Sequence, residues 1–168
     1  MGSSTAVEWP LGTRAAGNEG VASAVARTKG SIGYVEYAYV RQNRLTYSKL
    51  VNRDGKTVSP SLASFAAAAN NANWERAPGF GVILTNESGA ATWPVSGATF
   101  ILMPKQPSDV AAAAAALKFF DWAYAKGAKM AEELDYVPMP AGVVTAVRRL
   151  WAAQIKDPTG KAIYTLPR

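Results

Sequence analysis

Apolar residues recur at helical spacing in several stretches of this chain. Apolar positions three and four residues apart, flanked by capping and stop residues, predict helices at about 19–29, 38–42, 60–69, 109–126, 129–134 and 140–155. Asn18 is placed to cap the first of these and Ser108 the fourth, while Gly30 and Gly127 suit their ends. Helices are therefore expected to form much of the fold.

Two of the predicted helices carry distinct apolar faces. The helix at 109–126 presents one face made of Val110, Ala113, Ala114, Leu117, Phe120 and Tyr124. Lys118 and Asp121 fall away from that face. In the last helix the apolar stripe consists of Val143, Val144, Val147, Leu150, Trp151 and Ile155. We expect Trp151 to be buried within this stripe and Arg148 to stay in water.

Other apolar and aromatic runs have the character of strands. They lie at 31–37, 45–51 and 99–103, and an extended stretch from Trp93 leads into the last one. Between the second run and the next helix, Asp54-Gly55 supplies the positive φ that a tight hairpin turn needs, so a hairpin is predicted at 52–56. A few strands mixed with several helices indicate an α/β or α+β fold, and we take α/β as the prediction. The change of character at Trp93-Pro94 is the candidate boundary between two lobes.

Cysteine and histidine are both absent from the 168 residues. Their absence excludes thiol nucleophiles, disulfides, Cys/His zinc sites and a Ser-His-Asp triad. We therefore expect no cofactor and no metal, and we do not expect an enzyme. A chain without cysteine fits an exported bacterial protein and a cytosolic one equally. No apolar run is long enough for a membrane helix, and residues 1–5 lack the features of a signal peptide.

The net charge is +6, and part of the basic excess lies after Gly142. Such an excess can attract anions or nucleic acid, or it can form a solvated helix face and tail. No recognisable nucleic-acid-binding module accompanies these charges, so nucleic acid is not expected as a partner.

Three aromatic-rich motifs run in order along the chain. They are GSIGYVEYAY at 30–39, WP at 93–94 followed by TFIL at 99–102, and LKFFDWAY at 117–124 followed by LDYVPMP at 134–140. VEWP at 7–10 and GNEGV at 17–21 extend the pattern to nearly the whole chain. Together these motifs resemble the periplasmic phosphate-binding receptor of the bacterial phosphate ABC importer.

The resemblance implies a part of a two-lobed periplasmic-binding-protein (type II) fold, in which an anion binds between the lobes. Residues 1–92 resemble the later part of the second lobe, 93–100 the returning hinge strand, and 101–168 the C-terminal part of the first lobe. On this template the hinge residues are Trp93, Pro94, Thr99 and Phe100. The N-terminal half of the family has no counterpart here and is expected to be missing.

The implied function is that of a solute receptor for phosphate, with inorganic phosphate and a membrane permease as partners in the periplasm. The family's phosphate ligands come from early loops and from an Arg-x-Asp-x-x-x-Ser-Gly-Thr type segment, and no position of this chain matches them. We therefore assign no phosphate-binding residue in this chain. The alternative is a truncated fragment that binds no ligand and folds by self-association, with two copies exchanging the segment after Trp93-Pro94.

Two Ser-Gly segments and one helix start could also hold an anion. The segments at 88–92 and 96–99 offer hydroxyls and turn amides, but Ser and Gly are also the usual residues of turns. Residues 17–20 precede a helix N-terminus, where Glu19 would repel phosphate. We expect ordinary loop, hinge and capping roles for all three.

Two further groups of residues have both a functional and a structural interpretation. Tyr34, Tyr37 and Tyr39 could form a stacking surface for bases or sugars, but alternate tyrosines in a strand more often serve packing. Glu132 and Glu133 lie beside Lys129 and fit a solvated helix face. We expect the structural role in both cases.

Overall fold

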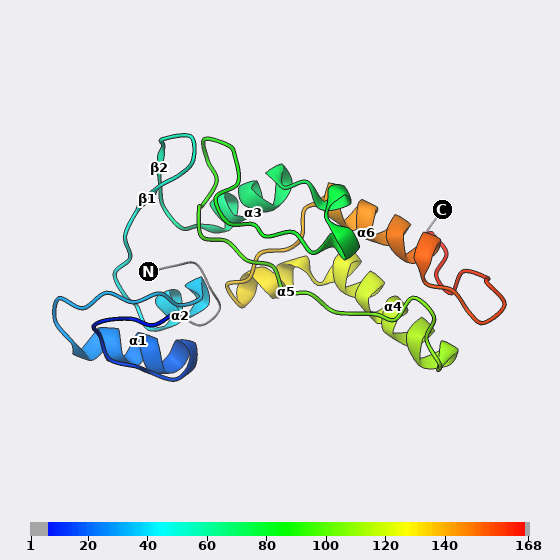
Figure 1. Ribbon diagram of the computed structural model, residues 1–168, viewed down its shortest axis with the longest axis horizontal. Coiled ribbons are helices and arrows are strands. Elements are labelled where there is room, and N and C mark those ends of the chain that lie inside the picture. Colours follow the sequence, from blue (N-terminus) through cyan, green and yellow to red (C-terminus); the bar gives the residue numbers. More distant parts are fainter. Residues whose placement is uncertain (1–6, 167–168) are drawn as a thin grey trace. The chain divides into compact units, whose positions relative to one another are not determined.

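The structure is a computed structural model that describes residues 7–166. It divides into two compact units, one ending at Tyr47 and the other beginning at Ser48. Figure 1 labels the helices and strands of both units. Helices dominate the described residues, and they are accompanied by one small antiparallel sheet, which is compatible with an α/β fold.

The first unit contains α1 (Gly17–Arg27) and α2 (Tyr37–Gln42), close to the predicted ranges. The prediction that Asn18 caps α1 is wrong. The helix begins at Gly17, and the Asn18 side-chain oxygen instead accepts a hydrogen bond from the backbone N–H of Glu36 at 2.9 Å. Asn18 therefore fastens the start of α2 to the start of α1.

The strand predicted at 31–37 is not formed. Residues 31–36 are extended but belong to no strand, and Ile32 and Tyr34 point into solvent. Gly33 lies against α1 so closely that a Cβ there would come within 2.8 Å of Val25 and 2.9 Å of Val21. The apolar run therefore packs on α1 on one side, but it has no neighbouring strand to pair with.

The second unit begins with the predicted hairpin. Strands β1 (Leu50–Val51) and β2 (Thr57–Val58) pair antiparallel, with Leu50 opposite Val58. Gly55 has a φ of +70° in the turn, which the Asp-Gly signal predicted. The hairpin is confirmed, although β1 is much shorter than the strand predicted at 45–51.

The remaining helices of this unit are α3 (Leu62–Asn71), η1 (Trp74–Arg76), η2 (Pro78–Phe80), α4 (Val110–Lys126), α5 (Ala128–Glu133) and α6 (Ala141–Gln154). Of these, α3, α4, α5 and α6 confirm the predicted helices to within a few residues at their ends, whereas η1 and η2 were not predicted. Asp109, and not Ser108, caps α4, because its carboxylate accepts a hydrogen bond from the Ala112 N–H at 2.9 Å. No helix among the described residues has the length and apolar character needed to cross a membrane.

Two apolar clusters form the interior of the second unit. The first gathers α3, η1 and the start of α6 around Ala69, Ala72, Trp74, Leu84 and Val143. The second joins α4 to the C-terminal segment through Leu117, Ile155 and Tyr164, with Trp151 packed against it. The segment from Ala98 to Met103 connects them, because Ala98 packs on the first cluster and Met103 on the second.

The buried strand predicted at 99–103 is also not formed. The segment crosses the unit without strand pairing, and Ile101 and Leu102 are exposed. A continuous apolar run is typical of a strand that has neighbours on both sides, and the described residues provide none.

Candidate functional site

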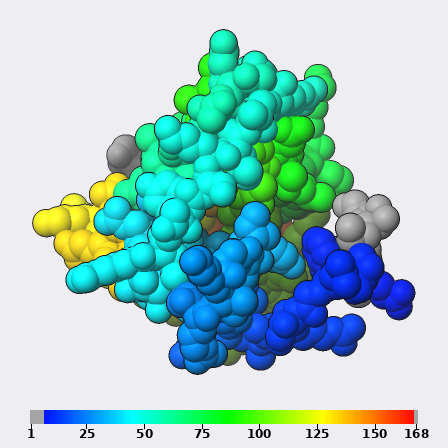
Figure 2. Space-filling model, turned by 90° about the vertical axis from the view of Figure 1, so that its left-hand side faces the viewer, coloured from blue at the N-terminus to red at the C-terminus, as the bar shows by residue number. Residues whose placement is uncertain are grey.

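The most highly connected polar site of the second unit joins the β1–β2 hairpin to the loop at 87–92. Asn52 is only 5% exposed, and its amide nitrogen contacts the carbonyl oxygens of Gly89, Ala90 and Thr92 at 3.0–3.2 Å. Its side-chain oxygen accepts hydrogen bonds from the N–H groups of Asp54 and Lys56. The buried Asn52 side chain therefore closes the hairpin turn and links it to the loop by hydrogen bonds. In Figure 2 the hairpin and the loop lie side by side at the top.

Some of the hydrogen-bond donors of this loop are engaged within the fold. The Gly89 N–H donates to the Asp54 carboxylate at 3.1 Å, and the Thr92 hydroxyl lies 2.7 Å from the Gly89 carbonyl oxygen. In the second Ser-Gly segment, the Ser96 hydroxyl donates to the Trp93 carbonyl oxygen at 3.1 Å. These bonds are the ordinary loop roles expected for both segments.

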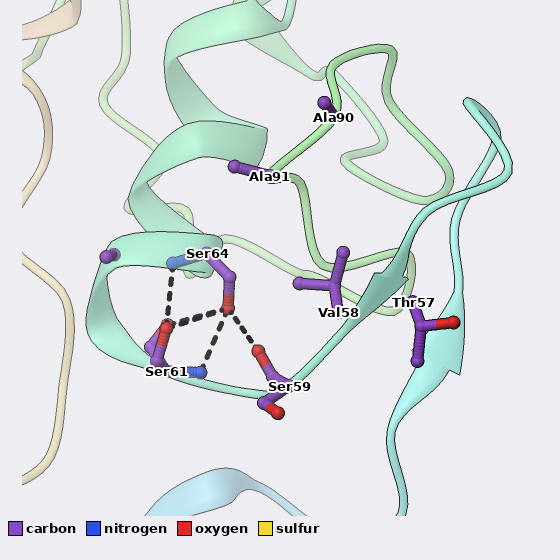
Figure 3. Close-up of a pocket in the computed structure, with 8 residues that line it drawn as sticks. Thr57, Val58, Ser59, Ser61, Ser64, Ala90 and Ala91 are labelled. Carbon is purple, nitrogen blue, oxygen red and sulfur yellow. Dashed lines mark hydrogen bonds between the residues drawn. The ribbon is translucent and has the colours of Figure 1, made fainter.

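A shallow open depression of about 380 Å³ lies beside this junction, between β2, the start of α3 and the loop. Figure 3 shows three serine side chains on its floor. Ser61 and Ser64 form a capping box, each accepting a hydrogen bond from the other's backbone N–H. The Ser64 hydroxyl also lies 2.9 Å from the Ser59 carbonyl oxygen. The hydroxyls of Ser61 and Ser64 are thus engaged within the helix start.

The four predicted hinge residues fall into two groups. Trp93 and Pro94 are buried; the Trp93 N–H donates to the Ser64 carbonyl oxygen at 3.1 Å, and its ring meets Phe65 edge to face. Thr99 and Phe100 are exposed, with the Phe100 ring 6.4 Å from that of Trp74. The segment is therefore anchored at its beginning and open at its end.

A second polar cluster joins α4, α6 and the C-terminal segment. The Asp121 carboxylate accepts hydrogen bonds from Arg148 at 2.6 Å and from the Tyr164 hydroxyl at 2.8 Å. Two predictions are wrong here: Asp121 does not point away from the packed face, and Arg148 is half-buried in an ion pair instead of lying in water. An aspartate and an arginine on facing helices satisfy each other, which a single-helix pattern cannot reveal.

The aromatic residues around this cluster are partly enclosed. Trp151 is half-buried, so the prediction of burial is correct only in part; its ring stacks on Tyr124 and meets Tyr164 edge to face. Burial raises the pKa of Tyr124 above its usual value, although Arg148 opposes this. Burial, and then the hydrogen bond to Asp121, raises the pKa of Tyr164. These shifts favour the neutral phenols and accompany packing.

The remaining candidates are dispersed over the structure. Tyr34 is exposed in an extended segment, whereas Tyr37 and Tyr39 belong to α2, so the three do not share the face of one strand. Lys129 and Glu133 form an exposed ion pair at 3.9 Å on α5, as expected of a solvated face. Within residues 7–166, no three acidic side chains come together in a way that could hold a metal ion.

Sequence reasoning missed the Asn52 junction. Asn52 was read only as part of the hairpin turn, although an asparagine just before Asp-Gly can hydrogen-bond the turn's own backbone. The asparagine before Asp-Gly therefore indicates the contacts within the turn. Nothing in the local sequence indicates the contacts with the loop, which lies 37–40 residues away. As described, both polar sites join elements of the fold together.

Comparison with known proteins identifies the family. The chain is 48% identical to the phosphate-binding protein PstS of Pasteurella multocida over 164 residues. These aligned residues make up 98% of this chain. It is 49% identical over 156 residues to that of Xylella fastidiosa and 47% identical over 157 residues to that of Haemophilus influenzae. No protein-family model matches the chain.

The chain spans about half the length of the curated relatives it matches: 48%, 43% and 47% of the three proteins. The similarity therefore extends over nearly all of this chain but over only part of each relative. By sequence, the chain belongs with the bacterial solute-binding proteins for phosphate. It corresponds to about half of a phosphate-binding protein PstS, consistent with the C-terminal half that the motifs indicated.

Proposed function

We propose that this chain is the framework part of a periplasmic phosphate receptor, the solute-binding component of an ABC importer. The observation that carries the proposal is the 47–49% identity to phosphate-binding proteins over at least 93% of the chain. In the complete receptor, hydrogen-bond donors hold the anion in a cleft between two lobes, and the closed form docks on the membrane permease. The role is binding and presentation, without a chemical step.

We further propose that the phosphate ligands lie outside this chain. A dehydrated oxyanion needs several free donors. In the Ser-Gly segments and the serine depression, the Gly89 N–H, the Ser96 hydroxyl and the Ser64 hydroxyl are already engaged within the fold. On this account residues 1–92 belong to the second lobe and 101–168 to the first. Residues 93–100 are the returning hinge, with Trp93 and Pro94 as its fixed end and Thr99 and Phe100 as its open end.

The experiment is a phosphate titration by calorimetry on two polypeptides. The first is this chain, for which we expect weak binding or none. The second joins the part of the Pasteurella multocida relative outside the aligned region to this chain, and we expect one phosphate bound tightly per molecule. Circular dichroism checks that both are folded. Tight stoichiometric binding by the chain alone, or none by the folded chimaera, would contradict the proposal.

A second candidate behaviour is self-association of the chain. Large exposed apolar side chains on the described surface favour it, since monomeric proteins rarely leave such patches open. Two copies could exchange the segment that follows Trp93-Pro94. Light scattering after size exclusion tests this: a protease-resistant monomer at tens of micromolar would exclude it.

A further inference from the structure

The hairpin turn contains the one Asp-Gly pair of the sequence, Asp54-Gly55, and the chain has no Asn-Gly pair. An aspartate followed by glycine rearranges readily without an enzyme, because glycine has no Cβ to hinder attack by its own backbone nitrogen. Both residues are exposed, and a Cβ built on Gly55 would meet no other atom within 4 Å. The turn therefore presents a reactive peptide bond in open space.

The rearrangement is internal and needs only water. The Gly55 backbone nitrogen attacks the side-chain carboxyl carbon of protonated Asp54, a new C–N bond forms, and the carboxyl hydroxyl leaves with the amide proton as water. Water then opens the five-membered succinimide at the main-chain carbonyl carbon of Asp54, and the original C–N bond breaks. The product is isoaspartate, which has the same composition but a backbone that runs through Cβ.

In the folded chain both reacting groups are engaged in other hydrogen bonds. The Asp54 carboxylate accepts the Gly89 N–H at 3.1 Å. The Gly55 N–H, whose nitrogen is the attacking atom, donates to the Asn52 carbonyl oxygen at 3.0 Å. The Asn52 N–H in turn donates to the Lys56 carbonyl oxygen at 2.9 Å. Ring closure therefore requires the turn to open and the carboxylate to leave the loop.

The side chain of Asn52 holds both partners of this arrangement in place. Its oxygen accepts the N–H of Asp54 at 3.1 Å, which orders the residue that carries the carboxyl group. Its nitrogen lies 3.0–3.2 Å from the carbonyl oxygens of Gly89, Ala90 and Thr92, which orders the loop that engages this carboxylate. Asn52 is itself buried, so these hydrogen bonds are shielded from competing water.

We propose that Asp54-Gly55 is a site of isoaspartate formation that the junction between the hairpin and the loop keeps closed. The bond rearranges in molecules whose junction has opened locally. Isoaspartate adds one carbon to the backbone of the turn and moves the free carboxylate, so the Gly89 N–H loses its partner. The modification thereby makes the opening permanent and releases the loop that leads into Trp93.

The test incubates the full chain in mildly acidic buffer, folded and in guanidinium chloride, and measures isoaspartate at position 54 by peptide mapping with electron-transfer fragmentation. We expect the folded chain to react at least about ten-fold more slowly than the unfolded one. Asn52→Asp keeps the oxygen that accepts from the turn but loses the amide that donates to the loop. It should react about ten-fold faster than the unchanged chain, whereas Asn70→Ala, on the exposed side of α3, should react at the unchanged rate.

Three results would overturn the proposal. They are the absence of isoaspartate at position 54 in the unfolded chain, equal rates for the folded and the unfolded chain, and equal rates for the folded Asn52→Asp and Asn70→Ala variants. Circular dichroism checks that both variants are folded. If Asn52→Asp does not fold, the comparison of the unchanged chain with and without guanidinium chloride decides the question by itself.

Discussion

Trp93-Pro94, expected as a hinge, and residues 100–102, expected in a buried strand, lie within ten residues of each other, yet their environments are the reverse of a simple apolar gradient: the first pair is buried and the strand residues are exposed. Trp93 and Pro94 are buried, and the Trp93 backbone is hydrogen-bonded to α3. Phe100, Ile101 and Leu102 are exposed, and their backbone is unpaired within the described residues. An apolar sequence pattern therefore indicates that the residues need to be buried, but it does not guarantee that they are. Whether they are buried depends on which other segments of polypeptide are present to pack on them.

The largest expected effect is at the buried end of this comparison. Trp93→Ala should lower the free energy of unfolding by about 4 kcal/mol, because it empties a packed site against Phe65. Phe100→Ala, at the open end, should cost only about 1 kcal/mol. Urea unfolding followed by circular dichroism measures both. Equal costs would remove the distinction between the two ends.

Trp151 extends the comparison to the helices. It is half-buried between Tyr124 and Tyr164, and Trp151→Ala should cost about 3 kcal/mol. The matched control is Trp122→Ala on the exposed outer face of α4, which should cost less than about 1 kcal/mol in the isolated chain. The same unfolding measurement applies. If the two substitutions cost the same, the outer face of α4 is covered.

Substitution of Asn52 measures how much the hydrogen bonds between the hairpin and the loop contribute to the free energy of unfolding. Asn52→Ala leaves the buried carbonyl oxygen of Thr92 without its side-chain donor and should cost about 2 kcal/mol. Asn70→Ala, on the exposed side of α3, should change stability by less than about 0.5 kcal/mol. A neutral Asn52→Ala in thermal or urea unfolding would show that the loop is not fixed by this amide.

Tyr164 adds a dependence on pH. Its pKa is raised above 10.0 in the folded chain, so the folded state keeps the phenol proton more tightly than the unfolded state does. The stability that results is fully present below pH 10.0 and is lost as the pH rises through the folded pKa. Tyr164→Phe should cost about 1 kcal/mol at neutral pH and flatten this alkaline loss. An unchanged alkaline profile would assign the loss to other groups.

Leu102→Lys should have the smallest effect on the isolated chain. The side chain is almost fully exposed, so stability should change by less than about 0.5 kcal/mol, while the tendency to self-associate should fall. Unfolding curves and light scattering measure the two properties on the same sample. A substantial loss of stability would place Leu102 in the interior after all.

The elements that depend on local signals could be predicted from the sequence. The Asp54-Gly55 hairpin, α3 with its serine start and α4 with its stop at Gly127 all formed near the expected positions. The strands at 31–37 and 99–103 did not form, because a strand needs a partner, and a run of apolar residues does not say where that partner is.

The site was predictable to a smaller extent. The family could be recognised from collinear motifs, since those motifs are a property of the sequence itself. The Asn52 contacts and the ion pair of Asp121 with Arg148 join residues 27–40 positions apart. Periodicity within one element carries no information about such pairs, which is why Arg148 was expected in water.

The central claim is that residues 99–102 are open whereas Trp93 is anchored, and hydrogen exchange measures it most directly. In the isolated chain, we expect the amides of 99–102 to exchange about as fast as unstructured backbone, whereas those of Thr92 and Trp93, which donate to Gly89 and Ser64, are protected. Protection of 99–102 equal to that of Trp93 in the dilute, monomeric chain alone would contradict the account.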